Sequence, residues 1–411
     1  MSGPSCRACG STRDHSFVDL GETPLANSYP GPEDLATPDA RYPLHARVCD
    51  ACFLVQVDAV VSSQEIFSDY AYFSSYSASW VEHARRFSEQ ARDEFGLGPD
   101  SLVVEVASND GYLLRHFKRA GIPVFGVEPA ANVAAVARDA GIETAVRFFG
   151  RRTAQDLVHD GRAADLLVGN NVLAHVPDLN DFVAGLALAV KPEGVISLEF
   201  PHLLKLIEQV QFDTIYHEHF SYFSLLALEP VFARHGLRVF HVETLATHGG
   251  SLRLSVCRRD SARHDDTPAP AALREAERDA GLHDLAIYSE FAMRVATARQ
   301  SLLAFLKGAR EDGKSVAAYG AAAKGNTLLN YCAIGTDLIE YVVDVSPHKQ
   351  GRYLPGSRLA IYGPEKLAET RPDYVLILPW NLADEITSHM AVVRDWGGRF
   401  VVPIPTTQVL P

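Results

Sequence analysis

Short apolar runs alternate with segments of helical spacing through the middle of the chain. The runs lie at residues 102–106, 124–128, 166–168 and 194–198. Continuous apolar strands separated by helices are typical of a parallel sheet with both faces covered. Residues 239–243 and 251–257 follow as a strand pair that closes this unit. The pattern therefore predicts an α/β fold with a central Rossmann-like domain.

A second alternation of the same kind lies nearer the C-terminus. Its expected strands are residues 315–319, 339–343 and 374–378, and its first expected helix is residues 326–332. A long, charged helical segment, residues 268–308, separates the two α/β units and is expected to bridge them. The N-terminal region is loop-rich and too small to build much core alone. We therefore expect three domains, at residues 1–65, 66–262 and 263–411.

Composition and charge exclude several classes of protein. The 411 residues have a formal net charge of -13 and no cluster of Lys and Arg, so a nucleic-acid partner is not expected. No apolar run is long enough to span a bilayer, and the N-terminal residues lack the basic and apolar regions of a secretory signal. We expect a cytoplasmic protein without a membrane partner. The sequence leaves the oligomeric state open, and a monomer is compatible with it.

Four of the six cysteines form two C-x2-C pairs, Cys6 with Cys9 and Cys49 with Cys52. Each pair can bind one metal ion through a tight turn, and four thiolates complete the tetrahedron that structural zinc prefers. Disulfide formation is the alternative, and it is rare in the cytoplasm. Because four thiolates leave no position for water, we expect Zn²⁺ in a structural role.

A candidate cofactor site follows the first strand of the central unit. Its polar turn contains Glu105, Ala107, Asn109 and Gly111. Ligands bind at the carboxyl ends of parallel strands, and the next strand ends in Glu128, where a carboxylate can accept both ribose hydroxyls. The G-x-G-x-x-G of a dinucleotide site is missing, which favours a nucleoside without phosphates, such as S-adenosylmethionine. A nicotinamide-dependent oxidoreductase and a plain polar turn are the alternatives.

The third strand also ends in polar residues, Asn170 and Asn171, with His175 shortly after. Contacts with the cofactor's amino-acid end and with a substrate would explain this crowding. A helix cap is the alternative, and it would account for one asparagine more readily than for all three residues.

The densest cluster of reactive side chains lies at residues 216–223. It contains Tyr216, His217, Glu218, His219 and Tyr222. Such residues can supply a base near neutral pH and hydrogen-bond donors for a developing oxyanion. A metal site is one alternative, although the H-E-x-x-H spacing is absent, and a solvated aromatic loop is another. His248 precedes two glycines that allow close approach of the backbone.

The second α/β unit contains a small-residue loop with Gly320, Lys324 and Asn326. Backbone N–H groups at a helix N-terminus bind phosphate, and the lysine adds positive charge. The loop predicts a nucleotide diphosphate site, although small residues also simply pack a helix against a sheet.

The ordered set of motifs resembles the deoxysugar C-methyltransferases of antibiotic biosynthesis. The motifs are the two cysteine pairs, EVASNDG at 105–111, GNNVLAHV at 169–176, YHEHFSYFS at 216–224, HGGSLR at 248–253 and YGAAAKGNTLLN at 319–330. The resemblance covers almost the whole chain. It implies a zinc-binding N-terminal module, a central class I methyltransferase domain and a C-terminal domain that helps to hold a dTDP-linked keto sugar.

The resemblance also implies the roles of individual residues. Glu128 would bind the cofactor ribose, and Tyr70, His175, Tyr216, Glu218 and His219 would surround the sugar. Among these we expect His219 to be the base that generates an enolate next to the C-4 ketone. Further substrate contacts are expected from Tyr222, His248, Gly320, Lys324 and Asn326. Methylation at C-3' is expected, with C-5' methylation, O- or N-methylation and a non-catalytic zinc-containing binding protein as alternatives.

Overall fold

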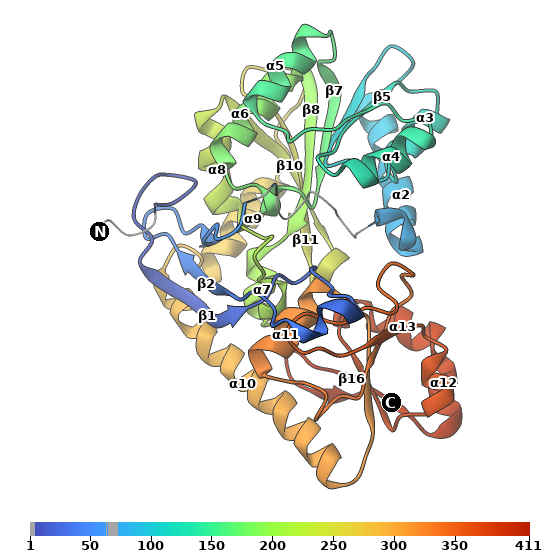
Figure 1. The fold of residues 1–411 in the computed structure, drawn as a ribbon. Coiled ribbons are helices and arrows are strands. Elements are labelled where there is room, and N and C mark those ends of the chain that lie inside the picture. Colours follow the sequence, from blue (N-terminus) through green and yellow to red (C-terminus); the bar gives the residue numbers. More distant parts are fainter. Residues whose placement is uncertain (1–4, 63, 65–72) are drawn as a thin grey trace. The chain divides into compact units, whose positions relative to one another are not determined.

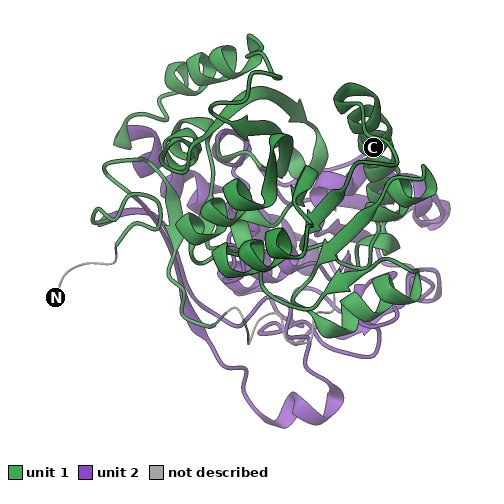
Figure 2. Cartoon of the chain, turned by 90° about the horizontal axis from the view of Figure 1, so that it is seen from above, with its two compact units in different colours: residues 1–14, 49–203, 220–285 green, residues 15–48, 204–219, 286–411 purple. Residues whose placement is uncertain are grey.

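The computed structural model describes residues 5–62, 64 and 73–411. The chain divides into two compact units, which Figure 2 colours separately. Unit 1 comprises residues 1–14, 49–203 and 220–285, and unit 2 comprises residues 15–48, 204–219 and 286–411. The two units interleave along the chain, and the three domain ranges expected from the sequence stay a prediction.

Unit 1 contains a seven-stranded sheet of order β10-β11-β8-β7-β4-β5-β6. Its strands are β4 (Val103–Val106), β5 (Val124–Val127), β6 (Thr144–Ala145), β7 (Ala164–Asn170), β8 (Val190–Pro201), β10 (Leu237–Leu245) and β11 (Ser251–Arg258). The five strands from β8 to β6 are parallel, whereas β10 and β11 pair antiparallel at the other edge. The predicted α/β sheet and its closing strand pair are therefore confirmed.

Helices cover both faces of this sheet (Figure 1). Val103 packs in the core with α2 (Ala78–Phe95) and α3 (Leu114–Arg119), whereas its neighbour Val104 packs with the opposite layer. That layer contains α5 (Arg151–His159), α6 (Leu179–Ala189), α8 (Leu225–Arg234) and α9 (Ala269–Asp279). Because successive side chains of a strand point to opposite faces, both must be apolar here, which explains the continuous apolar runs of the sequence.

The strand order of unit 1 reverses between β4 and β7. From β4 the chain proceeds to β5 and β6 on one side, and then returns to β7 and β8 on the other. In open α/β sheets this reversal creates a crevice at the carboxyl ends of the strands, where ligands bind. The turns after β4, β5 and β7 therefore mark the candidate cofactor site. One helix and three short turns lie near this candidate site: α4 (Ala131–Asp139), η2 (Ser74–Tyr76), η3 (Leu173–His175) and η5 (Thr247–Gly249).

Unit 2 contains a six-stranded sheet of order β14-β13-β12-β15-β16-β17. Its strands are β12 (Val316–Tyr319), β13 (Val342–Val343), β14 (Ile361–Tyr362), β15 (Tyr374–Ile377), β16 (Arg399–Val402) and β17 (Gln408–Val409), of which only β17 pairs antiparallel. The helices are α7 (Leu203–Glu208), α10 (Leu285–Glu311), α11 (Ala323–Cys332), α12 (Lys366–Thr370) and α13 (Ala383–His389), with short η turns at η1 (Pro32–Ala36), η4 (Phe212–Thr214), η6 (Trp380–Leu382) and η7 (Ala391–Trp396). This sheet is the predicted second α/β unit.

The antiparallel hairpin of β1 (His15–Thr23) and β2 (Tyr42–Val48) also belongs to unit 2. Phe17 of β1 stacks on Phe291 of α10 with ring centroids 4.3 Å apart, and both rings are fully buried. No helix in the described part of the chain combines the length and the apolar character needed to cross a membrane.

Candidate active site and zinc centre

The four predicted zinc ligands converge in unit 1. The Sγ atoms of Cys6, Cys9, Cys49 and Cys52 all lie within 4.8 Å of one another. Two of the sulfur pairs, Cys6 with Cys52 and Cys9 with Cys49, are 3.5 Å apart. Sulfur atoms at about 2.3 Å from a tetrahedral zinc ion would be separated by about 3.8 Å, so the cluster fits the ion. A search of the described residues for clusters of Cys, His, Asp and Glu side chains that could hold a metal ion finds this group of four cysteines.

The two cysteine pairs have the same backbone geometry. Gly10 N–H donates to the Cys6 carbonyl, and Phe53 N–H donates to the Cys49 carbonyl, each at 2.9 Å. Gly10 and Phe53 both have left-handed backbones, with φ of 79° and 58°. Gln56 Nε2 also donates to Cys6 Sγ at 3.1 Å. Two matching turns and an N–H donor to sulfur are features of a thiolate site that binds zinc.

The two turns that carry the cysteine pairs, the zinc turns, pack against helices α6 and α8 of unit 1. Asn180 of α6 donates to the carbonyls of Arg7 and Ala8, and Arg234 of α8 donates to the Ala8 carbonyl. Cys6 and Cys49 belong to the same buried cluster as the strands β4, β7 and β8. The cysteine centre therefore stabilises the core of unit 1.

Glu128 lies at the carboxyl end of β5, as predicted, and is almost fully buried. One carboxylate oxygen accepts from Asn109 N–H at 3.0 Å and the other accepts from Ala130 N–H at 2.9 Å. Burial raises the pKa of Glu128 to about 6. Each oxygen keeps lone pairs for a further donor, so the carboxylate fits the two hydroxyls of a ribose.

The turn after β4 has an unusual backbone. Ala107, Asn109 and Gly111 all have positive φ, at 55°, 51° and 77°. A Cβ on Gly111 would approach Ile142 Cδ1 to 2.4 Å, so only glycine fits there. Left-handed non-glycine residues cost energy and gather at functional sites. Glu105, inside β4, is buried, and burial raises its pKa well above its ordinary value.

The predicted asparagines lie at the carboxyl end of β7, next to this turn in the sheet order. Asn170 is buried, and within the described residues neither of its side-chain amide atoms has a partner. Asn171 Nδ2 donates to His248 Nε2 at 3.1 Å, and both residues have positive φ, at 53° and 55°. A buried amide without a partner needs an explanation, and a bound ligand that hydrogen-bonds to Asn170 provides one.

A network of charged side chains, which the sequence analysis did not predict, lies next to the His248 turn. Glu199, at the end of β8, is fully buried and accepts hydrogen bonds from Arg253 at 2.7 Å and from Thr247 at 3.0 Å. His83 Nε2 of α2 lies 2.8 Å from the same carboxylate, and its ring stacks on Trp80. Thr247 is the neighbour of His248, so the network holds the turn that carries His248.

Other predicted residues of unit 1 lie near the loop after β7. His175 is half-buried at the end of η3. Tyr222 is buried in β9 (Ser221–Tyr222), which pairs with β3 (Val55–Val57). Phe220 N–H donates to the Ala174 carbonyl at 2.7 Å, which ties the two loops together. Tyr70 lies outside the described residues.

Tyr216, Glu218 and His219 lie together in unit 2. The Tyr216 hydroxyl lies 2.8 Å from His219 Nε2. His219 Nδ1 lies 2.9 Å from the Thr214 carbonyl oxygen, which can only accept, so Nδ1 carries the proton. In the neutral imidazole Nε2 is therefore the basic atom, and the tyrosine donates to it.

Glu218 is buried beside the N-terminal hairpin of unit 2. Its Oε1 accepts from Asn27 Nδ2 at 2.7 Å, and its Oε2 has no partner within the described residues. Burial raises the pKa of Glu218 to about 7. His217 points instead to β2, where its Nε2 lies 3.2 Å from the Pro43 carbonyl. His217 therefore contacts the β2 backbone, whereas His219 contacts the Tyr216 hydroxyl.

The small-residue loop of unit 2 precedes α11. Lys324 Nζ donates to Asn381 at 2.7 Å and lies 5.0 Å from the centroid of the Trp380 ring. A Cβ on Gly320 would approach Pro379 Cδ to 2.4 Å. Asn326 is buried and donates to the Ala26 carbonyl, which gives it a structural partner. Within the described residues no side chain caps the N-terminus of α11, so its first N–H groups suit an anion.

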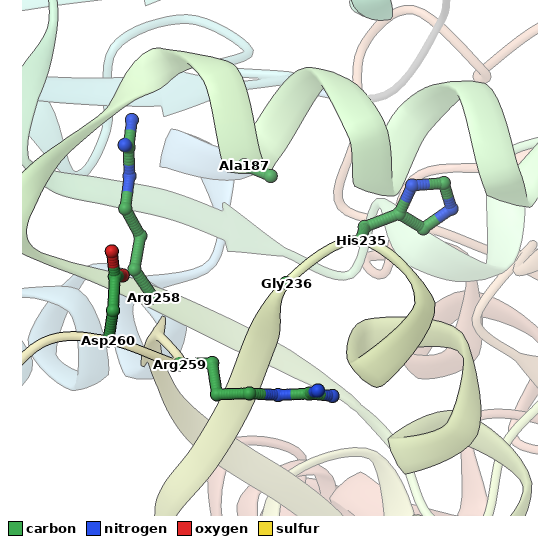
Figure 3. Close-up of a pocket in the computed structure, with 6 residues that line it drawn as sticks. All are labelled: Ala187, His235, Gly236, Arg258, Arg259 and Asp260. Atoms are coloured by element: carbon green, nitrogen blue, oxygen red, sulfur yellow. The ribbon is translucent and has the colours of Figure 1, made fainter.

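A cavity of about 360 Å³ lies elsewhere in unit 1 (Figure 3). Its lining includes His235, Arg258, Arg259 and Asp260. Arg258 ends β11, which places the cavity at the opposite end of the sheet from the carboxyl ends of β4, β5 and β7. None of the predicted site residues lines it.

Three family profiles match consecutive parts of the chain. Residues 6–67 match a domain described as "Putative zinc binding domain", residues 80–242 match a methyltransferase domain, and residues 246–405 match a C-methyltransferase C-terminal domain. The central unit is therefore a class I S-adenosylmethionine-dependent methyltransferase domain with a Rossmann-like fold. The predicted cofactors, S-adenosylmethionine and zinc, agree with these matches and with the cysteine cluster.

The chain is also similar to individual proteins. The C-methyltransferase NovU of Streptomyces niveus is 39% identical over 405 residues, which cover 98% of this chain and 96% of NovU. A ubiquinone biosynthesis O-methyltransferase of Methylobacterium sp. is 33% identical over 104 residues, which cover 24% of this chain and 42% of that enzyme. The crystal structure of magnesium protoporphyrin IX methyltransferase from Synechocystis aligns with 49% of this chain and 99% of its own, at 14% identity and a TM-score of 0.36.

Among these relatives, only NovU is matched over almost the whole chain. The name of this relative assigns its methyl transfer to carbon. The protein is an S-adenosylmethionine-dependent methyltransferase, and the chain belongs to the C-methyltransferase family.

Proposed function

We propose that the enzyme methylates C-3' of a dTDP-linked 4-keto-deoxysugar through an enolate, in antibiotic deoxysugar biosynthesis. The observation that carries the proposal is the Tyr216–His219 pair, in which His219 Nδ1–H donates to the Thr214 carbonyl and Nε2 is the basic atom. The full-length similarity to a C-methyltransferase supports a carbon nucleophile. C-5' methylation is the alternative, since a 4-ketone acidifies both neighbouring carbons.

The chemical problem is to make the sugar carbon nucleophilic. S-adenosylmethionine, when bound, supplies a methyl group that its sulfonium already activates. His219 Nε2 would accept the proton from the carbon next to the ketone, and the electrons of that C–H bond would move toward the ketone oxygen. The Tyr216 hydroxyl, which contacts Nε2, would then donate to the enolate oxygen, as would Tyr70 or His175. Glu218 would bind a sugar hydroxyl through the oxygen that Asn27 leaves available.

The residues for the cofactor would be those at the carboxyl ends of β4, β5 and β7. Glu128 would accept from the ribose hydroxyls, and the turn at Ala107, Asn109 and Gly111 would approach the ligand through its backbone. Glu105, Asn170 and Asn171 would complete the site. Tyr222 and His248 would contact the sugar, and the α11 N-terminus with Lys324 would hold the diphosphate.

Mass spectrometry and NMR of the products test the substrate and the position together. Purified enzyme would be incubated with S-adenosylmethionine and a panel of dTDP-4-keto sugars that differ at C-3' and C-5'. A single added methyl group on C-3' supports the proposal. Methylation at C-5' would support the alternative, and transfer to oxygen or nitrogen would contradict the mechanism.

Glu128 is expected to make cofactor binding depend on pH. An ionised carboxylate accepts hydroxyl donors better than a protonated one, and burial raises the pKa of Glu128 to about 6. S-adenosylmethionine affinity should therefore fall as the pH drops below about 6, and Glu128→Gln should remove this dependence and weaken binding by roughly tenfold or more. Calorimetric titrations over this pH range measure both effects, with the exposed Glu143→Gln as control. Unchanged affinity in Glu128→Gln would remove Glu128 from the site.

Lys324 is expected to contribute to binding of the nucleotide diphosphate. Burial lowers its pKa, whereas the charge of Asp213 acts against that shift, and a phosphate would provide a stronger counter-charge. Lys324→Ala should weaken the affinity for dTDP by about ten- to a hundredfold, as expected for one charged hydrogen bond. Lys366→Ala, a surface lysine paired with Glu369, is the control. If dTDP does not bind the wild-type enzyme, the substrate class is wrong.

A further inference from the structure

The turn of η4 determines the tautomer of His219. Its last residue, Thr214, accepts the His219 Nδ1–H through its carbonyl oxygen at 2.9 Å. A carbonyl in this place keeps the proton on Nδ1 and leaves Nε2 basic. The direction of one backbone carbonyl therefore decides whether the reacting nitrogen can accept a proton.

Side chains from η6 and α11 of unit 2 hold this turn in place. Trp380 Nε1–H donates to Asp213 Oδ2 at 2.7 Å, and Asp213 is 0% exposed. On the other side of Thr214, the Thr327 hydroxyl of α11 donates to the Ile215 carbonyl at 3.0 Å. Thr214 is thus held between two neighbours that are each bonded to a separate element of the same unit.

Asp213 is a costly residue for a purely structural position. A buried carboxylate loses its hydration, and its Oδ1 has no partner within the described residues. Burial raises the pKa of Asp213 to about 6, although the Lys324 charge acts in the opposite direction. A carboxylate fixes an indole N–H more strongly than a neutral acceptor does, because the bond is charge-assisted.

We propose that Asp213, held by Trp380, is a positioning residue that orients the Thr214 carbonyl and thereby keeps His219 in its Nδ1–H tautomer. This inference rests on the proposed role of His219 as the base. Without the bond to Trp380 the η4 turn can rotate, and the Nδ1–H donor loses its acceptor. The proton can then occupy Nε2, and an imidazole with Nε2–H cannot accept the substrate proton there.

The ring of His219 can be observed directly by ¹⁵N NMR of the histidine-labelled, zinc-loaded full-length enzyme, with His219→Asn used for assignment. Wild type should show the Nδ1–H tautomer. Trp380→Phe and Asp213→Ala should both show a mixture of tautomers, and kcat should fall about ten- to a hundredfold with a KM that changes less than threefold, as typical for loss of an orienting partner. Asp213→Asn, whose amide oxygen can still accept the indole N–H, should retain the tautomer and most of kcat.

Trp396→Phe is the matched control, because Trp396 of η7 also donates its indole N–H, to the Pro372 carbonyl at 3.1 Å in the same unit. It should leave the His219 signals and kcat unchanged. If His219→Asn abolishes turnover but Trp380→Phe and Asp213→Ala leave both the ring signals and kcat at wild-type values, the positioning role is wrong. If the ring signals shift in these variants but His219→Asn keeps normal turnover, the proposed base is wrong instead.

Discussion

Replacement of His219 by Asn is expected to lower kcat by about a hundred- to ten-thousandfold, the usual loss when a positioned general base is removed. Asn keeps a polar group of similar reach but cannot accept a proton near neutral pH. The Tyr216 hydroxyl, which lies 2.8 Å from Nε2, would remain but would have no base beside it. His219 is not one of the residues at the carboxyl ends of β4, β5 and β7 that are expected to bind S-adenosylmethionine, so the affinity for this cofactor should not change.

His217→Asn provides the internal control for this prediction. His217 is buried against β2, and its ring lies edge-on to Tyr42. Its replacement should lower thermal stability while leaving kcat within about tenfold of wild type. Steady-state kinetics, calorimetry with S-adenosylmethionine and solvent deuterium exchange into the sugar carbon distinguish the two variants. Near-normal turnover of His219→Asn, or an equal loss in His217→Asn, would contradict the assignment.

The sequence predicted the strands of the sheets better than it predicted their ends. Residues 339–343 were expected to form one strand, whereas β13 contains only Val342–Val343. Ile339 is fully buried, but its N–H donates to the Gly335 carbonyl in a turn. An apolar run in the sequence indicates that its residues are buried, but burial alone does not distinguish a strand from a buried turn.

The long helical segment shows a similar limit. Residues 268–308 were expected to be one bridge, but α9 ends at Asp279 and α10 begins at Leu285. Gly281, with φ of 86°, lies in the break. Glycine just after a helix is the common signal for a C-terminal end. The break was therefore visible in the sequence, whereas the helical start of α11 at Ala323, in a run of small residues, was not.

The predicted site residues were found from local sequence motifs. Their hydrogen-bond partners that are far away in the sequence could not be found in this way. The cysteine pairs and the turn after β4 were identified because their spacing is itself the signal. Asn27, the partner of Glu218, is 191 residues away from it, and Trp380 is 167 residues from Asp213. Neither residue lies in a recognisable motif. A single asparagine or tryptophan gives no signal in the sequence, because only the folded chain brings it to its partner. The roles of the individual site residues stay predictions.

Removal of a zinc ligand is expected to have the largest effect on stability. Binding of structural zinc contributes about 10 kcal/mol or more in small zinc peptides, which is comparable with the whole folding free energy of a domain. Cys49→Ser replaces a thiolate with a poor ligand in a site where the described residues provide only the four sulfur atoms. We expect the loss of stoichiometric zinc and a fall in the melting temperature of about 10 °C or more.

The destabilisation should reach the cofactor site, because the zinc turns are part of the core of unit 1. Cys6, Ala8, Cys49 and Leu54 pack in one buried cluster with Val104 and Val106 of β4, the strand that leads into the Ala107–Gly111 turn. Affinity for S-adenosylmethionine should therefore fall together with the zinc content.

Cys257→Ala is the matched control, since Cys257 is equally buried in unit 1 but lies outside the cluster of ligands. It should retain one zinc ion per chain and lose only about 1 kcal/mol of stability, within the usual range for removing a small buried group. Elemental analysis, thermal unfolding and calorimetry on both variants decide the matter: a Cys49→Ser enzyme with one tightly bound zinc ion and the wild-type melting temperature would show that Cys49 is not a ligand.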